Sequence, residues 1–313
     1  MKISIVRKAR LETIASASGV EVVDGIIYIL SDDSSCLYKI KHDLTLLDKI
    51  VLYNSSAENP EQIAKPEKAD LECMGQLSIN GYKHLLLLGS GSKSPHRDKG
   101  FLVKLPTNYN KKHIVWEVNC SSLYNLLRSH DEISSNREIN LEGLAFGNEK
   151  VYLLNRGNPS GSINAVLSFG KAEFTEYVQG HTEGVPFPSI HPLKLPAISG
   201  VETGFSGADF YDNQFWFSCS AEATSNAYDD GEIKGSMMGM LQIKEESNGR
   251  YLEEKIQLLN STIFQENGAP FLGKIESVSV YEKDKEGVYT AIAVTDNDGK
   301  PSELLLLDIQ LYY

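Results

Sequence analysis

The chain has 313 residues, and its 42 Asp and Glu residues outnumber its 30 Lys and Arg residues, for a formal net charge of −12. A nucleic acid binds through its phosphates to a positively charged surface, so this charge argues against such a partner. No stretch approaches the roughly 18 consecutive apolar residues of a membrane-spanning helix, which excludes a membrane protein of that kind.

The N-terminus and the cysteines indicate the cellular compartment. Residues 1–8 alternate in polarity and include Arg7 and Lys8, where a signal peptide would be apolar. We therefore expect a cytoplasmic protein, unless a leader has been trimmed. The cysteines have no CxxC spacing, so we expect buried, reduced thiols rather than a zinc site or a disulfide framework: Cys36, Cys73, Cys120 and Cys219.

Five segments of the chain share one pattern, which marks an internal repeat. In each segment an apolar residue precedes a short acidic or hydroxyl residue, here named the key position, and a turn and a second strand pattern follow. In three units an aromatic residue lies ten places after the key position, namely Tyr28, Tyr152 and Trp216. The five key positions are Ser18, Glu72, Glu142, Ser206 and Glu276.

Each unit predicts several short strands separated by turn residues, which is typical of a propeller blade. The first unit has strand patterns at residues 20–23, 26–30, 37–40 and 46–52, with a turn at Asp24-Gly25. The later units repeat this organisation at residues 71–77, 84–88, 101–105 and 114–118, then 141–146, 151–154, 165–169 and 174–178, then 206–211, 214–218, 237–243 and 251–259, and finally 276–281, 288–294 and 304–307.

We predict an all-β fold, a single-domain five-bladed β-propeller. The fifth unit has three strand patterns, and an alternating segment at residues 3–11 belongs to no unit. Pairing of the N- and C-terminal strands would close the ring and remove its exposed edges. The predicted blades are approximately residues 18–54, 70–119, 140–180, 204–260, and 275–313 together with 1–12.

Two segments fall outside the strand pattern. Residues 123–129 follow two serines and show helical apolar spacing, so we predict one helix there. Residues 178–199 are rich in proline and lack the strand-turn-strand pattern, which argues against a sixth blade.

The key positions predict a metal site. Each opens the innermost strand of its blade, so all five should converge at one end of the central channel. Carboxylates that converge without a counter-ion raise one another's pKa, and a divalent cation relieves this repulsion. Calcium accepts about six to eight oxygen ligands in flexible geometry, whereas magnesium needs a tighter octahedron. We predict Ca²⁺ as the cofactor; the alternative is that these are ordinary solvated residues at strand starts.

Five polar loops should surround this site. The second strand of each blade runs back toward the end of the channel where the first strand began. The loops that follow these second strands should therefore lie around the metal, and function on a rigid scaffold usually resides in such loops. They comprise residues 31–34, 89–97, 155–158, 220–224 and 295–298.

The sequence resembles the calcium-activated nucleotidase (apyrase) family of five-bladed propellers with one calcium in the channel. The resemblance lies in residues 22–28 with Asp32 and Asp33 after them, in residues 68–72 and in residues 204–210, and covers about a third of the chain. The channel ligands of that family also run Ser, Glu, Glu, Ser, Glu in chain order. The resemblance thus implies the same five metal ligands as the key positions.

The resemblance also implies an activity, the hydrolysis of nucleoside di- and triphosphates. In such an enzyme the metal polarises the phosphates, carboxylates position the water, and Arg or Lys neutralises charge. Asp32 and Asp33 match the acidic pair of the family and are the implied catalytic residues. Arg156 matches a phosphate-binding arginine, and Lys93 falls in the corresponding glycine-rich loop. Ser34 stands where the family leads us to expect arginine.

Three hypotheses about function remain open. The first is a calcium-dependent hydrolase of phosphoanhydrides such as nucleotides, with a phosphorylated small molecule as its ligand. The second is a metal-dependent hydrolase of esters, lactones or phosphate esters. The third is a non-catalytic propeller in which calcium is structural and the polar face binds a ligand or a protein, because propellers host many unrelated activities.

Overall fold

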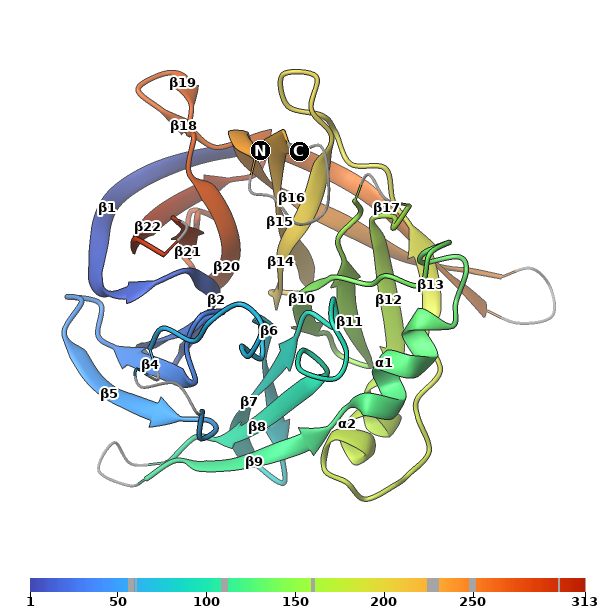
Figure 1. Cartoon of the computed structure of the whole chain (residues 1–313). Coiled ribbons are helices and arrows are strands. Elements are labelled where there is room, and N and C mark those ends of the chain that lie inside the picture. Colours follow the sequence, from blue (N-terminus) through green and yellow to red (C-terminus); the bar gives the residue numbers. More distant parts are fainter. Residues whose placement is uncertain are drawn as a thin grey trace.

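The protein is a closed ring of five sheets around a central channel, as Figure 1 shows. The computed structural model describes residues 1–55, 59, 61–107, 112–158, 161–223, 231–247, 252–297 and 299–312. Each sheet has four antiparallel strands, and the innermost strands of neighbouring blades contact one another all the way round. The predicted all-β, five-bladed propeller is therefore confirmed.

Four blades are built from consecutive strands, ordered from the channel outward. Blade 1 consists of β2 (Ala17–Val23), β3 (Ile26–Ser31), β4 (Cys36–Ile40) and β5 (Leu46–Val51). Blade 2 consists of β6 (Leu71–Ile79), β7 (Tyr82–Gly89), β8 (Lys99–Lys104) and β9 (Ile114–Asn119). Blade 3 consists of β10 (Leu141–Phe146), β11 (Lys150–Asn155), β12 (Ala165–Gly170) and β13 (Ser189–Pro192). Blade 4 consists of β14 (Thr203–Tyr211), β15 (Gln214–Ala223), β16 (Glu232–Ser247) and β17 (Leu252–Ile263).

Blade 5 joins the two ends of the chain. It consists of β20 (Lys274–Lys283), β21 (Tyr289–Asp296), β22 (Pro301–Gln310) and, outermost, β1 (Lys2–Ala15). Strand β1 runs antiparallel to β22, from the pair Lys2–Gln310 to the pair Ala15–Pro301. The predicted closure is thus confirmed, and the termini lie close together in Figure 1. A small hairpin, β18 (Gln265–Glu266) and β19 (Ala269–Pro270), precedes the blade.

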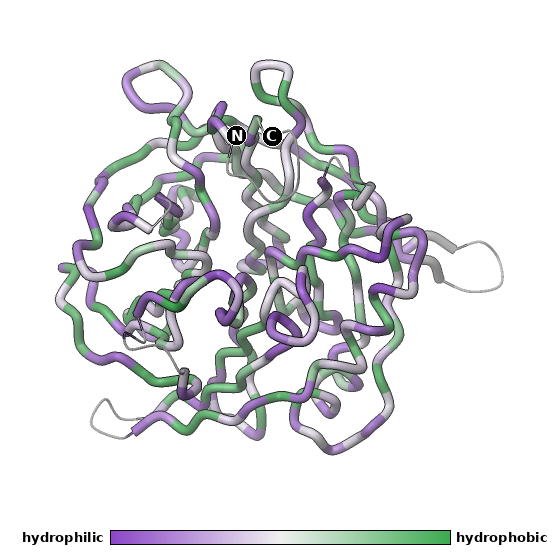
Figure 2. The backbone as a smooth tube through the Cα atoms, in the orientation of Figure 1, coloured by the Kyte–Doolittle hydropathy of each residue, from purple (hydrophilic) through white to green (hydrophobic). Residues whose placement is uncertain are grey.

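The core of the protein is divided among the interfaces between blades. Five hydrophobic clusters occupy the five interfaces between neighbouring blades. In Figure 2 apolar and polar stretches accordingly alternate along the chain around the whole ring. The repeated aromatic residues serve this packing: Tyr152 contacts Phe215 of the next blade at 5.0 Å between ring centres, and Trp216 contacts Tyr289 at 5.1 Å. The pattern of the sequence therefore reflects blade-to-blade packing.

The predicted helix is confirmed as α1 (Ser121–Arg128), but the fourth strand predicted at residues 174–178 is wrong. That segment is part of a second helix, α2 (Lys171–Val178). Its buried residues Phe174, Tyr177 and Val178 have helical spacing, and so short a window of apolar residues does not separate helix from strand. The true fourth strand of the blade is β13, so blade 3 extends beyond residue 180 into the proline-rich segment.

Two further observations concern the cysteines and the helices. All four thiols are buried, and none forms a disulfide, as predicted. Within the described part of the chain, neither helix has the length and apolar character needed to cross a bilayer.

Close packing around the channel predicts a stability effect at Gly207, on the innermost strand of blade 4. A Cβ atom there would lie 2.8 Å from Ser277 Cα and 2.9 Å from the Glu276 carbonyl oxygen. Because these are backbone atoms of the next blade, we expect Gly207→Ala to lower the free energy of unfolding by about 1–3 kcal/mol. Chemical denaturation measures this effect.

A matched control for this substitution is Gly184→Ala, in an exposed loop. The atom that would approach the new Cβ is the Thr182 hydroxyl oxygen at 3.3 Å, which belongs to an exposed side chain that can rotate away. The control should unfold close to wild type. A Gly207→Ala protein as stable as the control would contradict the close packing of blades 4 and 5.

Candidate metal centre

All five key positions are β-bulges in the innermost strands. In blade 1, Ala17 pairs with Ser31 and Gly19 pairs with Leu30, so Ser18 has no partner on β3. The same skip occurs at Glu72, Glu142, Ser206 and Glu276. A bulge bends the strand and redirects the side chain of the extra residue. The repeat in the sequence is therefore a repeated backbone irregularity at one end of the channel.

The two key serines connect neighbouring blades. The Ser18 hydroxyl donates a hydrogen bond of 2.6 Å to the carbonyl oxygen of Leu71, the residue before Glu72. The Ser206 hydroxyl donates one of 2.7 Å to the carbonyl oxygen of Ile275, the residue before Glu276. Each serine thus fixes the backbone that presents a glutamate. A hydroxyl oxygen that donates its proton still offers lone pairs to a cation or a water molecule.

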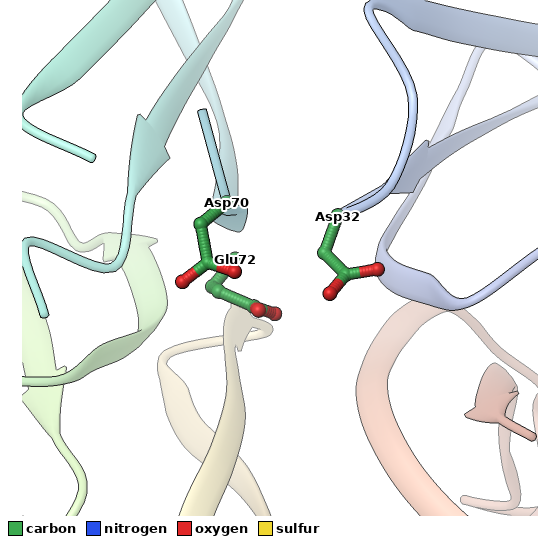
Figure 3. A group of neighbouring side chains, drawn as sticks. All are labelled: Asp32, Asp70 and Glu72. Atoms are coloured by element: carbon green, nitrogen blue, oxygen red, sulfur yellow. The ribbon is translucent and has the colours of Figure 1, made fainter. Parts of the chain in front are cut away.

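One key glutamate joins two aspartates to form a compact acidic group. Oxygens of Asp32, Asp70 and Glu72 all lie within 4.8 Å of one another. Figure 3 shows Asp32, which follows β3, facing Asp70 and Glu72 at the start of β6. Oxygens bound to one calcium at about 2.4 Å can be at most twice that distance apart. This spacing suits a shared cation.

Two cationic side chains already contact this acidic group. The buried ammonium group of Lys68 contacts Asp32 and lies 3.0 Å from Asp33 Oδ1 and 3.2 Å from Asp70 Oδ1. Arg97 Nη1 lies 2.6 Å from Asp70 Oδ2. Buried charges need such partners because their removal from water is costly.

The end of the channel where the key positions lie is here called the mouth. A second network of charges lies at the mouth beside blades 4 and 5. Lys274 Nζ lies 2.9 Å from Glu276 Oε1, 3.8 Å from Asp296 Oδ2 and 3.9 Å from Glu222 Oε2. Arg156 donates to the Phe205 carbonyl oxygen at 3.1 Å and lies 3.5 Å from Glu222.

The side chain of Arg156 reaches this position because it packs against Gly204, which has no side chain. A Cβ atom at Gly204 would lie 2.6 Å from the Arg156 Cγ atom, so a side chain at that position would block the arginine. The guanidinium group consequently lies deep in the mouth, where its charge acts on Glu142 and Glu276.

Carboxyl groups outnumber cationic side chains at the mouth. Among the described residues, eight carboxylates meet four cationic side chains, an excess of four formal charges: Asp32, Asp33, Asp70, Glu72, Glu142, Glu222, Glu276 and Asp296 against Lys68, Arg97, Arg156 and Lys274. Burial raises the pKa of Asp32 to about 7, although the charge of Lys68 opposes the rise. Burial likewise raises the pKa of Glu142 to about 8, opposed by Arg156.

Two carboxylate oxygens in this region are buried without a hydrogen bond. They are Asp32 Oδ1 and Glu276 Oε2, and neither has a donor among the described residues. The Glu276 residue is only 4% exposed. A buried acceptor without a donor is costly, so each such atom calls for a water molecule or an ion. Both are carboxylate oxygens, the kind of ligand atom that coordinates a hard cation.

The structure places most of the predicted site residues at the mouth, with two differences. The glutamates 72, 142 and 276 act on one another electrostatically, yet among the described residues the group with metal-like spacing is Asp32, Asp70 and Glu72. Lys93 is exposed, and its loop reaches the acidic group through Arg97 instead. Asp32, Asp33 and Arg156 lie at the mouth as expected.

Sequence reasoning placed Arg97, Glu222 and Asp296 in the loops predicted to surround the site, where the structure has them, but gave them no individual role, and it assigned no role to Lys68, Asp70 and Lys274. One signal could have found some of them: strand neighbours two places apart point to the same side. Asp70 and Lys274 each stand two residues before a key glutamate, and Ser16, two residues before Ser18, donates to Asp33 Oδ2 at 2.9 Å. Ser16 and Asp70 also have positive φ angles of 47° and 52°, a strained conformation that clusters at functional sites.

A separate pair of carboxyl groups lies three residues beyond the key positions. Glu21 of β2 accepts a hydrogen bond of 3.4 Å from the Ser279 hydroxyl. Asp209 of β14 accepts the backbone N–H groups of Val280 and Phe210. Burial, and then the charge of Asp209, raise the pKa of Glu21, and burial raises the pKa of Asp209 to about 7. Glu21 therefore holds its proton to higher pH than an exposed glutamate does.

The fold and the mouth together define a class: a five-bladed β-propeller with an acidic cluster at one end of its channel. Residues 13–309 match the model of DUF6929, a family of unknown function, and the chain belongs to that family. A search of curated protein sequences finds no match.

Several solved structures are similar to this chain over most of its length, at low sequence identity. A glutaminyl cyclase of Myxococcus xanthus has 8% identity and a TM-score of 0.48, with 99% of this chain and 97% of that chain covered. An α-L-arabinanase of Cellvibrio cellulosa has 9% identity and a TM-score of 0.48, with 98% and 94% covered. A virginiamycin B lyase of Staphylococcus aureus has 10% identity and a TM-score of 0.41, with 99% and 100% covered. At such identities no function transfers from these proteins to this chain.

The Glu21–Asp209 pair predicts a pH effect on stability. In the unfolded chain Glu21 loses its proton near a pH of about 4.3, whereas the folded protein holds that proton to higher pH. The pair therefore stabilises the fold less as pH rises above this value. Glutamine is neutral throughout, so the unfolding temperature of Glu21→Gln minus that of wild type should increase from pH 5 to pH 8.

The comparison needs an exposed carboxylate as a control. Glu282→Gln, at an exposed position of β20, should give a difference from wild type that does not vary with pH in this range. If the difference for Glu21→Gln is equally flat, Glu21 does not hold a proton in the folded protein.

Proposed function

We propose that the mouth of the channel binds a divalent cation, calcium foremost, and with it binds and hydrolyses a small phosphorylated molecule. The observation that carries this proposal is the excess of carboxyl groups over cationic side chains at the mouth, with the buried oxygens Glu276 Oε2 and Asp32 Oδ1 left without hydrogen-bond donors. The resemblance to calcium-activated nucleotidases supports phosphoanhydrides as the first substrate class.

The donor atoms fit calcium. The compact group of Asp32, Asp70 and Glu72 offers carboxylate oxygens alone, which suit a hard cation rather than zinc or copper. Glu276 Oε2 and the two key serines offer further oxygens from the other blades. The ammonium group of Lys68 competes for the same aspartates, so binding of the metal would weaken these ion pairs.

Each side chain at the mouth has a role in this proposal. Bound calcium would withdraw charge from the phosphoryl oxygens. Arg156 and Lys274 lie opposite the acidic group and would bind the oxygens of the phosphate, as guanidinium and ammonium groups do. Asp33 is outside the compact group and is held by Ser16 and Lys68, so it is the carboxylate that would position a water molecule for attack.

One observation favours a second candidate, a non-catalytic propeller with structural calcium. Lys68 and Lys274 already neutralise part of the acidic charge, as in a site built for stability. In that case metal binding would stabilise the ring, and the polar face would bind a ligand without converting it. Metal binding and phosphate release, measured separately, distinguish the two candidates.

Metal binding is tested by thermal unfolding after removal of metals with a chelator. We expect calcium to raise the unfolding temperature in proportion to the logarithm of its concentration. At one hundred times the Kd, the free energy of unfolding should increase by about 2.7 kcal/mol. Glu72→Gln removes a charged ligand and should abolish most of this gain. Glu117→Gln, on the outermost strand of the same blade, should keep it. Equal gains in both variants would place the metal elsewhere.

Catalysis is tested by phosphate release from nucleoside di- and triphosphates and from phosphate esters. We expect release with calcium, and none with excess chelator. Asp33→Asn should reduce kcat by about 100-fold or more, as loss of a general base does, while the stabilisation by calcium persists. Stabilisation by calcium without hydrolysis of any of these substrates would support the non-catalytic candidate.

A further inference from the structure

A cavity of about 430 Å³ opens beside the mouth, between blades 4 and 5. Its walls come from the start of β16, the segment that leads into β20, and the turn between β21 and β22. Lys274 and Asp296 line this cavity and also belong to the charge network of the mouth, where their side chains lie 3.8 Å apart. The cavity therefore adjoins the mouth, and Lys274 and Asp296 belong to both.

The lining combines charged side chains of both signs with apolar ones. Arg10, Lys274 and Lys300 contribute three positive charges against the two carboxylates of Asp296 and Glu303, and Ile233 and Leu272 contribute apolar surface. Leu272 is 65% exposed although it stands directly before Gly273 at the entrance to β20. Covering this exposed apolar side chain with the organic part of a ligand would remove apolar surface from water and so favour binding.

The volume sets the size of the ligand. Small-molecule sites measure about 300–1,000 Å³ and combine apolar walls with a few polar groups, as this cavity does. A bare phosphate ion would occupy the charged end near Lys274 and leave Leu272 and Ile233 in water. An organic phosphate would bury both ends, since its phosphoryl group fits the cations and its organic group fits the apolar wall.

We infer that this cavity receives the organic group of the ligand, so that the protein selects organic phosphates over inorganic phosphate or pyrophosphate. The inference rests on the proposed function, because it places the phosphoryl group at the mouth. It adds the class of ligand and a residue, Leu272, that determines the preference. Lys300, on the turn between β21 and β22, contributes positive charge without distinguishing the two kinds of phosphate.

Two probes that differ only in the organic group test the inference. Binding of phenyl phosphate and of inorganic phosphate is measured by calorimetry on the full chain in the presence of calcium. We expect phenyl phosphate to bind at least about tenfold more tightly, roughly the effect of 1.4 kcal/mol. Leu272→Asp should reduce this ratio to about threefold or less, and Leu272→Ser should give an intermediate value.

Two control variants make the result specific. Leu259→Asp introduces the same change at a similarly exposed leucine on the outermost strand of blade 4, and it should leave the ratio unchanged. Lys300→Gln should weaken both probes by a similar factor and so preserve the ratio. Unfolding temperatures of all variants, measured alongside, confirm that each protein is folded.

The outcomes separate this inference from the proposed function. If calcium has no effect but phenyl phosphate is still preferred and Leu272→Asp removes the preference, the proposed metal binding is wrong. The inference that the cavity selects the organic group is then still supported. Equal affinities for the two probes in wild type would overturn the inference. So would a preference that survives Leu272→Asp, or the failure of both probes to bind.

Discussion

Concentrated negative charge at one end of a narrow channel is the constraint on which the rest of this structure depends. Carboxyl groups from all five blades approach one another at sites that are buried or half-buried, and the cations nearby offset only part of the resulting desolvation penalty. The inner strands bulge at five equivalent points, three of which present glutamates and two of which present serines. The hydroxyls of Ser18 and Ser206 then fix the backbone of the neighbouring blade, so the geometry of the mouth is a property of the whole ring.

The sequence allowed the fold to be predicted because each blade repeats the same physical problem. An inner strand must bulge, turn and lead into a second strand whose aromatic residue packs on the next blade, so Tyr152 of β11 and Trp216 of β15 recur at a fixed distance from Glu142 and Ser206. Helix α2 was missed because it lies in the connection between β12 and β13, where Gly170 ends β12 and the apolar residues are too few to define a period.

The site was predictable only in part, for a related reason. Acidic key positions share one phase of the repeat and can be aligned, whereas their counter-ions come from different places in different blades. Lys68 precedes an inner strand, Arg97 follows a second strand after a long loop, and Arg156 depends on the absence of a side chain at Gly204. Pairing of this kind is decided by three-dimensional proximity, which no single spacing in the sequence records.

The closure of the ring by β1 has a consequence for folding during synthesis. Strand β1 leaves the ribosome long before its partner strand β22, which ends at Gln310, so this pairing must wait until all five blades have been made. Contacts between such distant segments slow folding, because the intervening loop must close first. Arg10 on β1 and Asp296 at the end of β21 line the same cavity, so the walls of this cavity are complete only after β1 has paired with β22.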